Sequence, residues 1–162
     1  MSLKILVVRM TAVFVLASVM FGATPSQAAE KKNYTNKELK MMSAIIFCEA
    51  GNQSQAGKEA VGIVVMNRKK SADFPNSVEK VLKQKNQFTP VRTGKWKKEM
   101  KKYSDGKYES GARAKCVKAA KAALEGETAV TYKGKEINMN KYHFFSQRLS
   151  RAKLRIGGHD FK

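Results

Sequence analysis

In Ala44-Ile45-Ile46-Phe47-Cys48-Glu49-Ala50-Gly51-Asn52 an apolar helix face ends on a carboxylate, and a Gly-Asn break follows at once. The preceding Thr35-Asn36-Lys37-Glu38 has the T-x-x-E form of a capping box, which predicts a helix from near Asn36 to about Glu49. Residues at three- and four-residue steps share one stripe of such a helix. That stripe is apolar until its last member: Leu39, Met42, Ile45, Ile46 and Glu49.

The glutamate that ends this stripe is the first candidate for chemistry. Burial beside apolar side chains disfavours a charged carboxylate, and so does the negative end of the helix dipole. Both effects predict a raised pKa for Glu49, which a general acid working near neutral pH requires. The alternative is a glutamate at a frayed helix end that simply reaches water.

The N-terminal segment has the pattern of a secretory signal peptide over residues 1–28. Lys4 and Arg9 give a basic start, an apolar run follows, and Ser26-Gln27-Ala28 resembles a cleavage site. The apolar run is short for a membrane span, although an uncleaved anchor stays open as the alternative. We therefore expect residues 29–37 to be a linker and residues 38–162 to form one domain, with no stable membrane span after cleavage.

The net charge of the chain is +19, and the leader contributes only Lys4 and Arg9 to it. The remainder therefore stays near +17 and should attract polyanions. For an exported protein these are anionic wall polymers, peptidoglycan carboxylates or acidic lipid headgroups. We expect a secreted, wall-associated monomer with no nucleic-acid partner.

Cys48 and Cys116 are the only cysteines. An exported protein meets conditions that permit disulfides, so a Cys48–Cys116 bridge and two buried free thiols are both open. Two cysteines and two histidines at these spacings do not make a zinc site, and we expect no metal and no cofactor.

The rest of the chain indicates an α+β fold that is mainly helical. Asn67 brings a polar group onto the buried face of the second helix, where it must find hydrogen bonds. Lys95–Lys107 fits a helix or a loop equally well. The expected elements are helices over about Ser54–Lys69, Asn76–Gln84 and Gly111–Leu124, an extended segment over Asn86–Val91, and two or three short strands within Val130–Phe161.

Three separated blocks of the sequence together resemble the SleB/CwlJ family of cell-wall hydrolases. The first is Cys48-Glu49-Ala50-Gly51-Asn52-Gln53-Ser54, continued by Gly57, Ala60-Val61-Gly62 and Val64-Val65-Met66-Asn67-Arg68. The second is Phe74-Pro75-Asn76-Ser77-Val78 followed by Gln87-Phe88-Thr89-Pro90-Val91. The third is Ile156-Gly157-Gly158-His159-Asp160-Phe161.

This resemblance implies a lysozyme-like, two-lobed catalytic domain with a short C-terminal β element. The family cleaves the β-1,4 bond between N-acetylmuramic acid (MurNAc) and N-acetylglucosamine (GlcNAc), and some members are lytic transglycosylases that leave 1,6-anhydro-muramic ends. The family's catalytic glutamate falls on Glu49. Expected partners are peptidoglycan glycan strands, with possible substrate contacts at Asn67, Gln87, Phe88, Thr89, Tyr142, Phe145 and His159.

The sequence offers Glu49 no patterned carboxylate partner, which favours transglycosylation over hydrolysis, since hydrolysis normally uses two carboxyls. A hydrolytic muramidase stays open, with Glu59 or Asp160 as the base. Two other functions also stay open. One is a thiol peptidase that uses Cys48 with His143 or His159, and the other is a non-enzymatic cationic wall-binding protein.

Overall fold

The computed structural model describes residues 32–162, so the predicted signal peptide over 1–28 lies outside the described residues. The first helix, α1 (Asn36–Ala50), begins at the predicted capping box. The Glu38 amide donates to Thr35 Oγ1 over 3.1 Å, and the Thr35 amide donates to Glu38 Oε2 over 2.9 Å. Within residues 32–162 no helix is long and apolar enough to cross a membrane.

Helices α2 (Gln55–Lys70) and α6 (Gly111–Glu125) pack against α1 and confirm two further predicted helices. Gly62 lets their backbones approach closely, because a Cβ there would lie 3.0 Å from Ala123 Cβ and 3.1 Å from Ile46 Cδ1. Helix α6 is capped by Gly126, whose left-handed φ of 104° is typical of the glycine that follows the end of a helix. The resulting core includes fully buried side chains from both α1 and α2, namely Met42, Ile45, Ile46, Val61, Ile63, Val64 and Val65.

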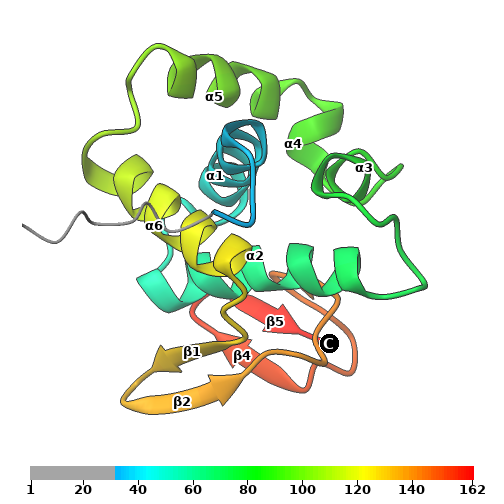
Figure 1. Ribbon diagram of the computed structural model, residues 1–162. Helices are drawn as coiled ribbons and strands as arrows, with labels where there is room; N and C mark the ends of the chain where they lie inside the picture. The colour runs from blue at the N-terminus through cyan, green and yellow to red at the C-terminus, as the bar shows by residue number, and fades with distance from the viewer. Residues whose placement is uncertain (1–31) are drawn as a thin grey trace, which may run out of the picture. The chain divides into compact units, whose positions relative to one another are not determined.

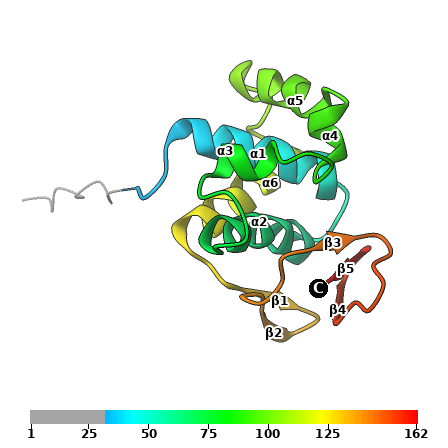
Figure 2. The ribbon, with the colours of Figure 1, turned by 90° about the vertical axis from the view of Figure 1, so that its right-hand side faces the viewer.

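Three shorter helices cover the other side of α1 (Figure 2): α3 (Val78–Leu82), α4 (Thr89–Arg92) and α5 (Lys95–Ser104). The prediction of an extended segment over Asn86–Val91 was wrong except at Phe88. Asn86 lies in a turn with a left-handed φ of 63°, and α4 is a helical turn that starts at Thr89. Pro90 lies in the first turn of α4, where a missing N–H breaks no helical hydrogen bond. The undecided segment over Lys95–Lys107 is helical as far as Ser104, and the indole of Trp96 fixes it by donating to the Met41 carbonyl over 3.0 Å.

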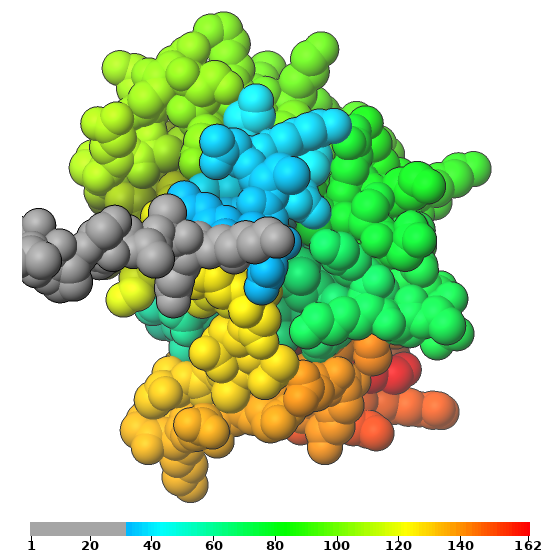
Figure 3. Space-filling model, viewed as in Figure 1, coloured from blue at the N-terminus to red at the C-terminus, as the bar shows by residue number. Residues whose placement is uncertain are grey.

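The C-terminal part of the chain forms two small antiparallel sheets. One is the hairpin of β1 (Ala129–Tyr132) and β2 (Lys135–Asn138), whose surface adjoins the end of α6 (Figure 3). The other has the order β3-β5-β4, from β3 (Phe145–Ser146), β4 (Leu154–Ile156) and β5 (His159–Phe161). Both lie beyond α2 as seen from α1 and α5 (Figure 1), which confirms the mainly helical α+β class.

Candidate active site

Glu49 lines a cavity of about 390 Å³ at the C-terminal end of α1. The cavity lies where α1, the end of α2, the start of α4 and the sheet β3-β5-β4 meet. Segments far apart in the sequence therefore build its walls. The other lining residues are Cys48, Arg68, Gln87, Thr89, Phe145, Ser146, Gln147 and His159.

The carboxyl group of Glu49 is half-buried, and this burial raises its pKa above the ordinary value of 4.5. Within residues 32–162 its oxygens take part in no hydrogen bond or ion pair. A carboxyl group that is partly desolvated and unpaired keeps its proton to higher pH and can give it to a bound molecule. This arrangement agrees with the expectation from the apolar stripe.

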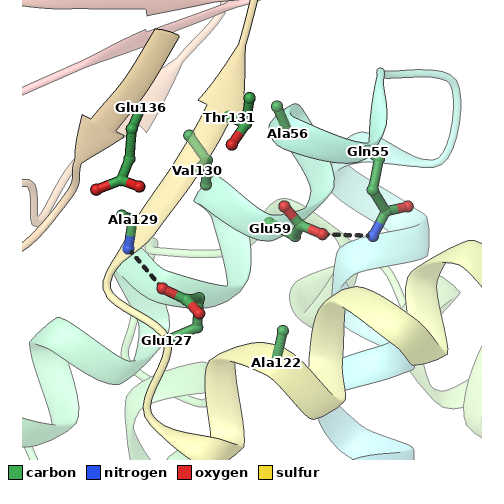
Figure 4. A pocket seen from close by; sticks show the side chains of 9 residues that line it. All are labelled: Gln55, Ala56, Glu59, Ala122, Glu127, Ala129, Val130, Thr131 and Glu136. Atoms are coloured by element: carbon green, nitrogen blue, oxygen red, sulfur yellow. Dashed lines mark hydrogen bonds between the residues drawn. The ribbon is translucent and has the colours of Figure 1, made fainter. Parts of the chain in front are cut away.

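Among the described residues, no second carboxylate lines this cavity. Glu59 lines a different cavity, between α2, α6 and the β1–β2 hairpin, where it accepts a hydrogen bond from Gln55 Nε2 over 2.9 Å (Figure 4). Asp160 is bound by Arg155 over 2.7 Å and by the Leu149 amide over 3.2 Å. Both residues named as possible bases are therefore engaged elsewhere.

His159 enters the cavity from β5 and is 5% exposed. Burial lowers the pKa of its imidazole, and nearby Arg155 lowers it further, so the ring is neutral at pH 7. Its Nδ1 atom is buried and has no hydrogen-bond partner within residues 32–162. The ring of Phe145 meets it edge to face, with centroids 5.4 Å apart. The imidazole ring lines the cavity, although its Nδ1 atom is not exposed to it.

Sequence reasoning did not single out Arg68 as a site residue. Its guanidinium is buried, and this burial lowers its pKa to about 10. Arg68 Nε donates to the His143 carbonyl over 2.6 Å, whereas the buried Nη1 has no partner among the described residues. No signal in the sequence distinguishes Arg68, because a cation in the last turn of a helix is ordinary. Aromatic rings of Phe74, Phe88 and Phe144 surround the guanidinium.

The seven predicted substrate contacts separate into two groups. Gln87, Thr89, Phe145 and His159 line the cavity with Glu49. The other three do not line it and are buried: Asn67, Phe88 and Tyr142.

These three buried residues stabilise the fold. Asn67 Nδ2 donates to the carbonyls of Met139 and Tyr142 over 2.7 and 2.9 Å, which satisfies the polar group on the buried face of α2. Phe88 packs on Phe145, and Tyr142 on Phe161. Their positions do not support a role as sugar contacts.

Both cysteines are free, so the disulfide between Cys48 and Cys116 is not formed. Burial raises the pKa of Cys48 to about 12, with Glu99 and Glu49 as further causes, and burial raises that of Cys116 to about 11. A nucleophilic thiol needs a low pKa, so this environment argues against a thiol peptidase even though His159 lines the same cavity as Cys48. Within residues 32–162 no group of three metal-ligating side chains comes together.

Gln53 connects the turn after Glu49 to the strand that carries His159. Its Oε1 atom accepts a hydrogen bond from the Gly158 amide over 2.8 Å. The buried ammonium of Lys58 donates to the Gln53 carbonyl and fixes the turn from the other side. Gly157 has a φ of 57°, and a Cβ there would lie 2.6 Å from Gln53 Oε1. The two glycines thus let the β4–β5 turn fit closely against Gln53.

The Cell Wall Hydrolase family matches residues 52–162 of the chain, a range that begins just after Glu49. Spore cortex-lytic enzymes of Oceanobacillus iheyensis and Bacillus cereus are both 33% identical to it, over 73 and 61 residues. These matches cover 45% and 38% of this chain but only 26% and 24% of the relatives, so the chain matches about a quarter of their length.

Among solved structures, the catalytic domain of the germination-specific lytic transglycosylase SleB from Bacillus anthracis is similar in fold. The TM-score is 0.56 at 22% sequence identity, and the match covers 79% of this chain and 95% of that domain. This likeness supports the expected lysozyme-like fold.

Proposed function

The chain belongs to the Cell Wall Hydrolase family, and from that premise we propose that it cleaves the β-1,4 MurNAc–GlcNAc bond of peptidoglycan as a lytic transglycosylase. The observation that carries this proposal is the cavity in which Glu49 is the one carboxylate among the lining residues. Its raised pKa suits it to protonate a leaving oxygen.

A single carboxyl group is sufficient for this reaction. Protonated Glu49 gives its proton to the glycosidic oxygen as the bond from C1 breaks. The 6-hydroxyl of the same muramic residue then attacks C1, and the Glu49 carboxylate takes the proton of that hydroxyl. The attack is intramolecular and gains from proximity. The product is a 1,6-anhydro-muramic end, and Glu49 is again protonated for the next cycle.

The other polar groups of the cavity are assigned to substrate binding. Gln87, Thr89 and Gln147 can hydrogen-bond acetamido and hydroxyl groups, and the ring of His159 offers a further contact surface. Phe145 presents a partly exposed ring on which a sugar can stack. Arg68 lines the same cavity and can offer its cationic guanidinium, whose Nη1 has no partner among the described residues, to an oxygen of the substrate.

Hydrolysis is the less favoured alternative. Retaining and inverting glycosidases normally use two carboxyls, whereas Glu59 and Asp160 both lie outside the cavity of Glu49.

The positive charge of the chain supports attraction to anionic wall polymers and a cell-wall location after export. Residues 1–28 are proposed as the signal peptide, 29–37 as a linker and 38–162 as the catalytic domain. The protein is proposed to act as a monomer.

The deciding experiment is mass spectrometry of peptidoglycan digested by the purified protein. Transglycosylation gives products lighter by one water than the reducing ends that hydrolysis leaves. Glu49→Gln should lower turnover by at least about 10²-fold, whereas the exposed and unpaired Glu109→Gln serves as the matched control. Near-normal turnover by Glu49→Gln would refute the site, and no cleavage by the folded wild type would favour the non-enzymatic wall-binding protein.

A further inference from the structure

A second cavity, of about 360 Å³, adjoins that of Glu49. Cys48 lines both cavities, so they share a wall at the end of α1. One side of the second cavity is the end of α1, and the other is a face of α5. Its lining residues are Phe47, Cys48, Lys95, Lys98, Glu99 and Lys102.

The second cavity has three lining lysines, and two of them, Lys95 and Lys98, are paired with no carboxylate within residues 32–162. Its one acid, Glu99, is 7% exposed and already bound by Lys102 over 2.7 Å, by the Tyr108 hydroxyl over 3.1 Å and by Arg113 over 3.0 Å. Lys95 and Lys98 are exposed and form no ion pair within residues 32–162. Their ammonium groups are therefore available to an anionic ligand.

The same cavity also has an apolar surface that is fixed in place. The guanidinium of Arg113 lies 4.3 Å from the centroid of the Phe47 ring, and Tyr108 meets that ring edge to face with centroids 6.1 Å apart. An apolar wall below a cationic rim fits a ligand with short aliphatic groups and carboxylates. A bare polyphosphate would leave the apolar wall unused.

We infer that this cavity binds the stem peptide of the glycan strand, the short alanine-rich and carboxylate-bearing chain attached to the lactyl group of muramic acid. The inference rests on the proposed function, which puts muramic acid in the adjoining cavity. If the cavity binds the stem peptide, glycan strands that carry peptides should be better substrates than strands whose muramic residues carry none. Lys95 and Lys98 are then residues that determine specificity.

The test compares one peptidoglycan preparation before and after an amidase has removed its stem peptides. Lys95→Gln/Lys98→Gln removes the two free cations of the cavity. Lys97→Gln/Lys121→Gln is the matched control, since it removes the same charge at exposed lysines that line neither cavity. Exposed ion pairs each change an equilibrium by about 1.4- to 5-fold. We therefore expect roughly a 2- to 30-fold lower kcat/KM for the cavity variant on peptide-bearing strands, and no change on stripped strands.

Equal loss on both substrates, or a wild type indifferent to the peptides, would overturn the inference without touching the role of Glu49. Failure of the proposed function is seen separately, as active Glu49→Gln protein or as absence of any cleavage. If no cleavage is seen, the inference is tested by measuring binding of the disaccharide probes instead. The Glu49→Gln protein should bind GlcNAc–MurNAc with its stem peptide more tightly than the peptide-free disaccharide. The Lys95/Lys98 variant should lose that difference, and equal binding of the two probes contradicts the inference.

Discussion

Replacing Gly157 by alanine should weaken the attachment of the C-terminal sheet to the turn after Glu49. Alanine pays the strain of a left-handed backbone at a φ of 57°, about 1–2 kcal/mol. Its Cβ would also lie 2.6 Å from Gln53 Oε1, so the amide must move and lose its bond to Gly158. That bond contributes about 0.5–1.5 kcal/mol. We therefore expect Gly157→Ala to lower the free energy of unfolding by roughly 1.5–3.5 kcal/mol.

A double-mutant cycle separates the two causes. In a Gln53→Ala background the overlap and the bond are both absent, so Gly157→Ala should cost only the backbone strain, about 1–2 kcal/mol. Urea unfolding of the four proteins gives these values, and kcat/KM on peptidoglycan, measured well below the melting temperature, reports whether His159 has moved. An equal cost of Gly157→Ala with and without Gln53 would refute the contact as a cause.

Four further outcomes are expected. Burial raises the pKa of Glu49, so the stability that its protonated form gives is present below pH 4.5 and lost as pH rises through the folded-state pKa. Glu49→Gln should therefore melt at a higher temperature than wild type at pH 8 and at the same temperature at pH 3, as calorimetry can check. The alkaline limb of kcat/KM should have its midpoint above 4.5, and a midpoint at or below that value would contradict Glu49 as the acid. Reductant should leave the melting temperature unchanged, and Cys116, which is 0% exposed, should react with an alkylating reagent only after unfolding. Binding to purified walls should weaken as salt rises past about 0.1 M, where screening acts beyond about 10 Å, and salt-independent binding would contradict attraction by charge.

The helical part of the fold could be predicted from the sequence because its signals are local. Thr35 and Glu38 mark the start of α1 by a hydrogen-bonded exchange within one turn, and Gly126 marks the end of α6 by its backbone conformation. The wrong expectation at Asn86–Val91 has a local cause too. Asn86 adopts a left-handed turn conformation, Phe88 alone is extended, and the helical turn starts at Thr89, so one short segment holds three conformations.

The candidate site could be predicted only where one element supplied the signal. Glu49 was singled out because its stripe on α1 is otherwise apolar, and the structure places it in a cavity. Arg68 was missed because its importance comes from contacts with aromatic rings on distant segments, which no spacing along α2 reveals. Phe88 and Tyr142 were expected at the sugar because aromatic residues suit both a core and a sugar platform. The burial of these two side chains, which can be read only from the packed fold, places them in the core and outside the lining of the cavity.

The hydrogen bond between Gln53 and Gly158 joins segments that lie 105 residues apart. The helices hold Glu49, whereas the opposite wall of its cavity belongs to strands of two or three residues. Such short strands open locally at lower free energy than a packed helical core. Warming should therefore abolish cleavage at a temperature where the helical circular dichroism is still native, and cooling should restore it. We therefore expect the loss of activity on warming to report detachment of a small sheet before the helical core melts.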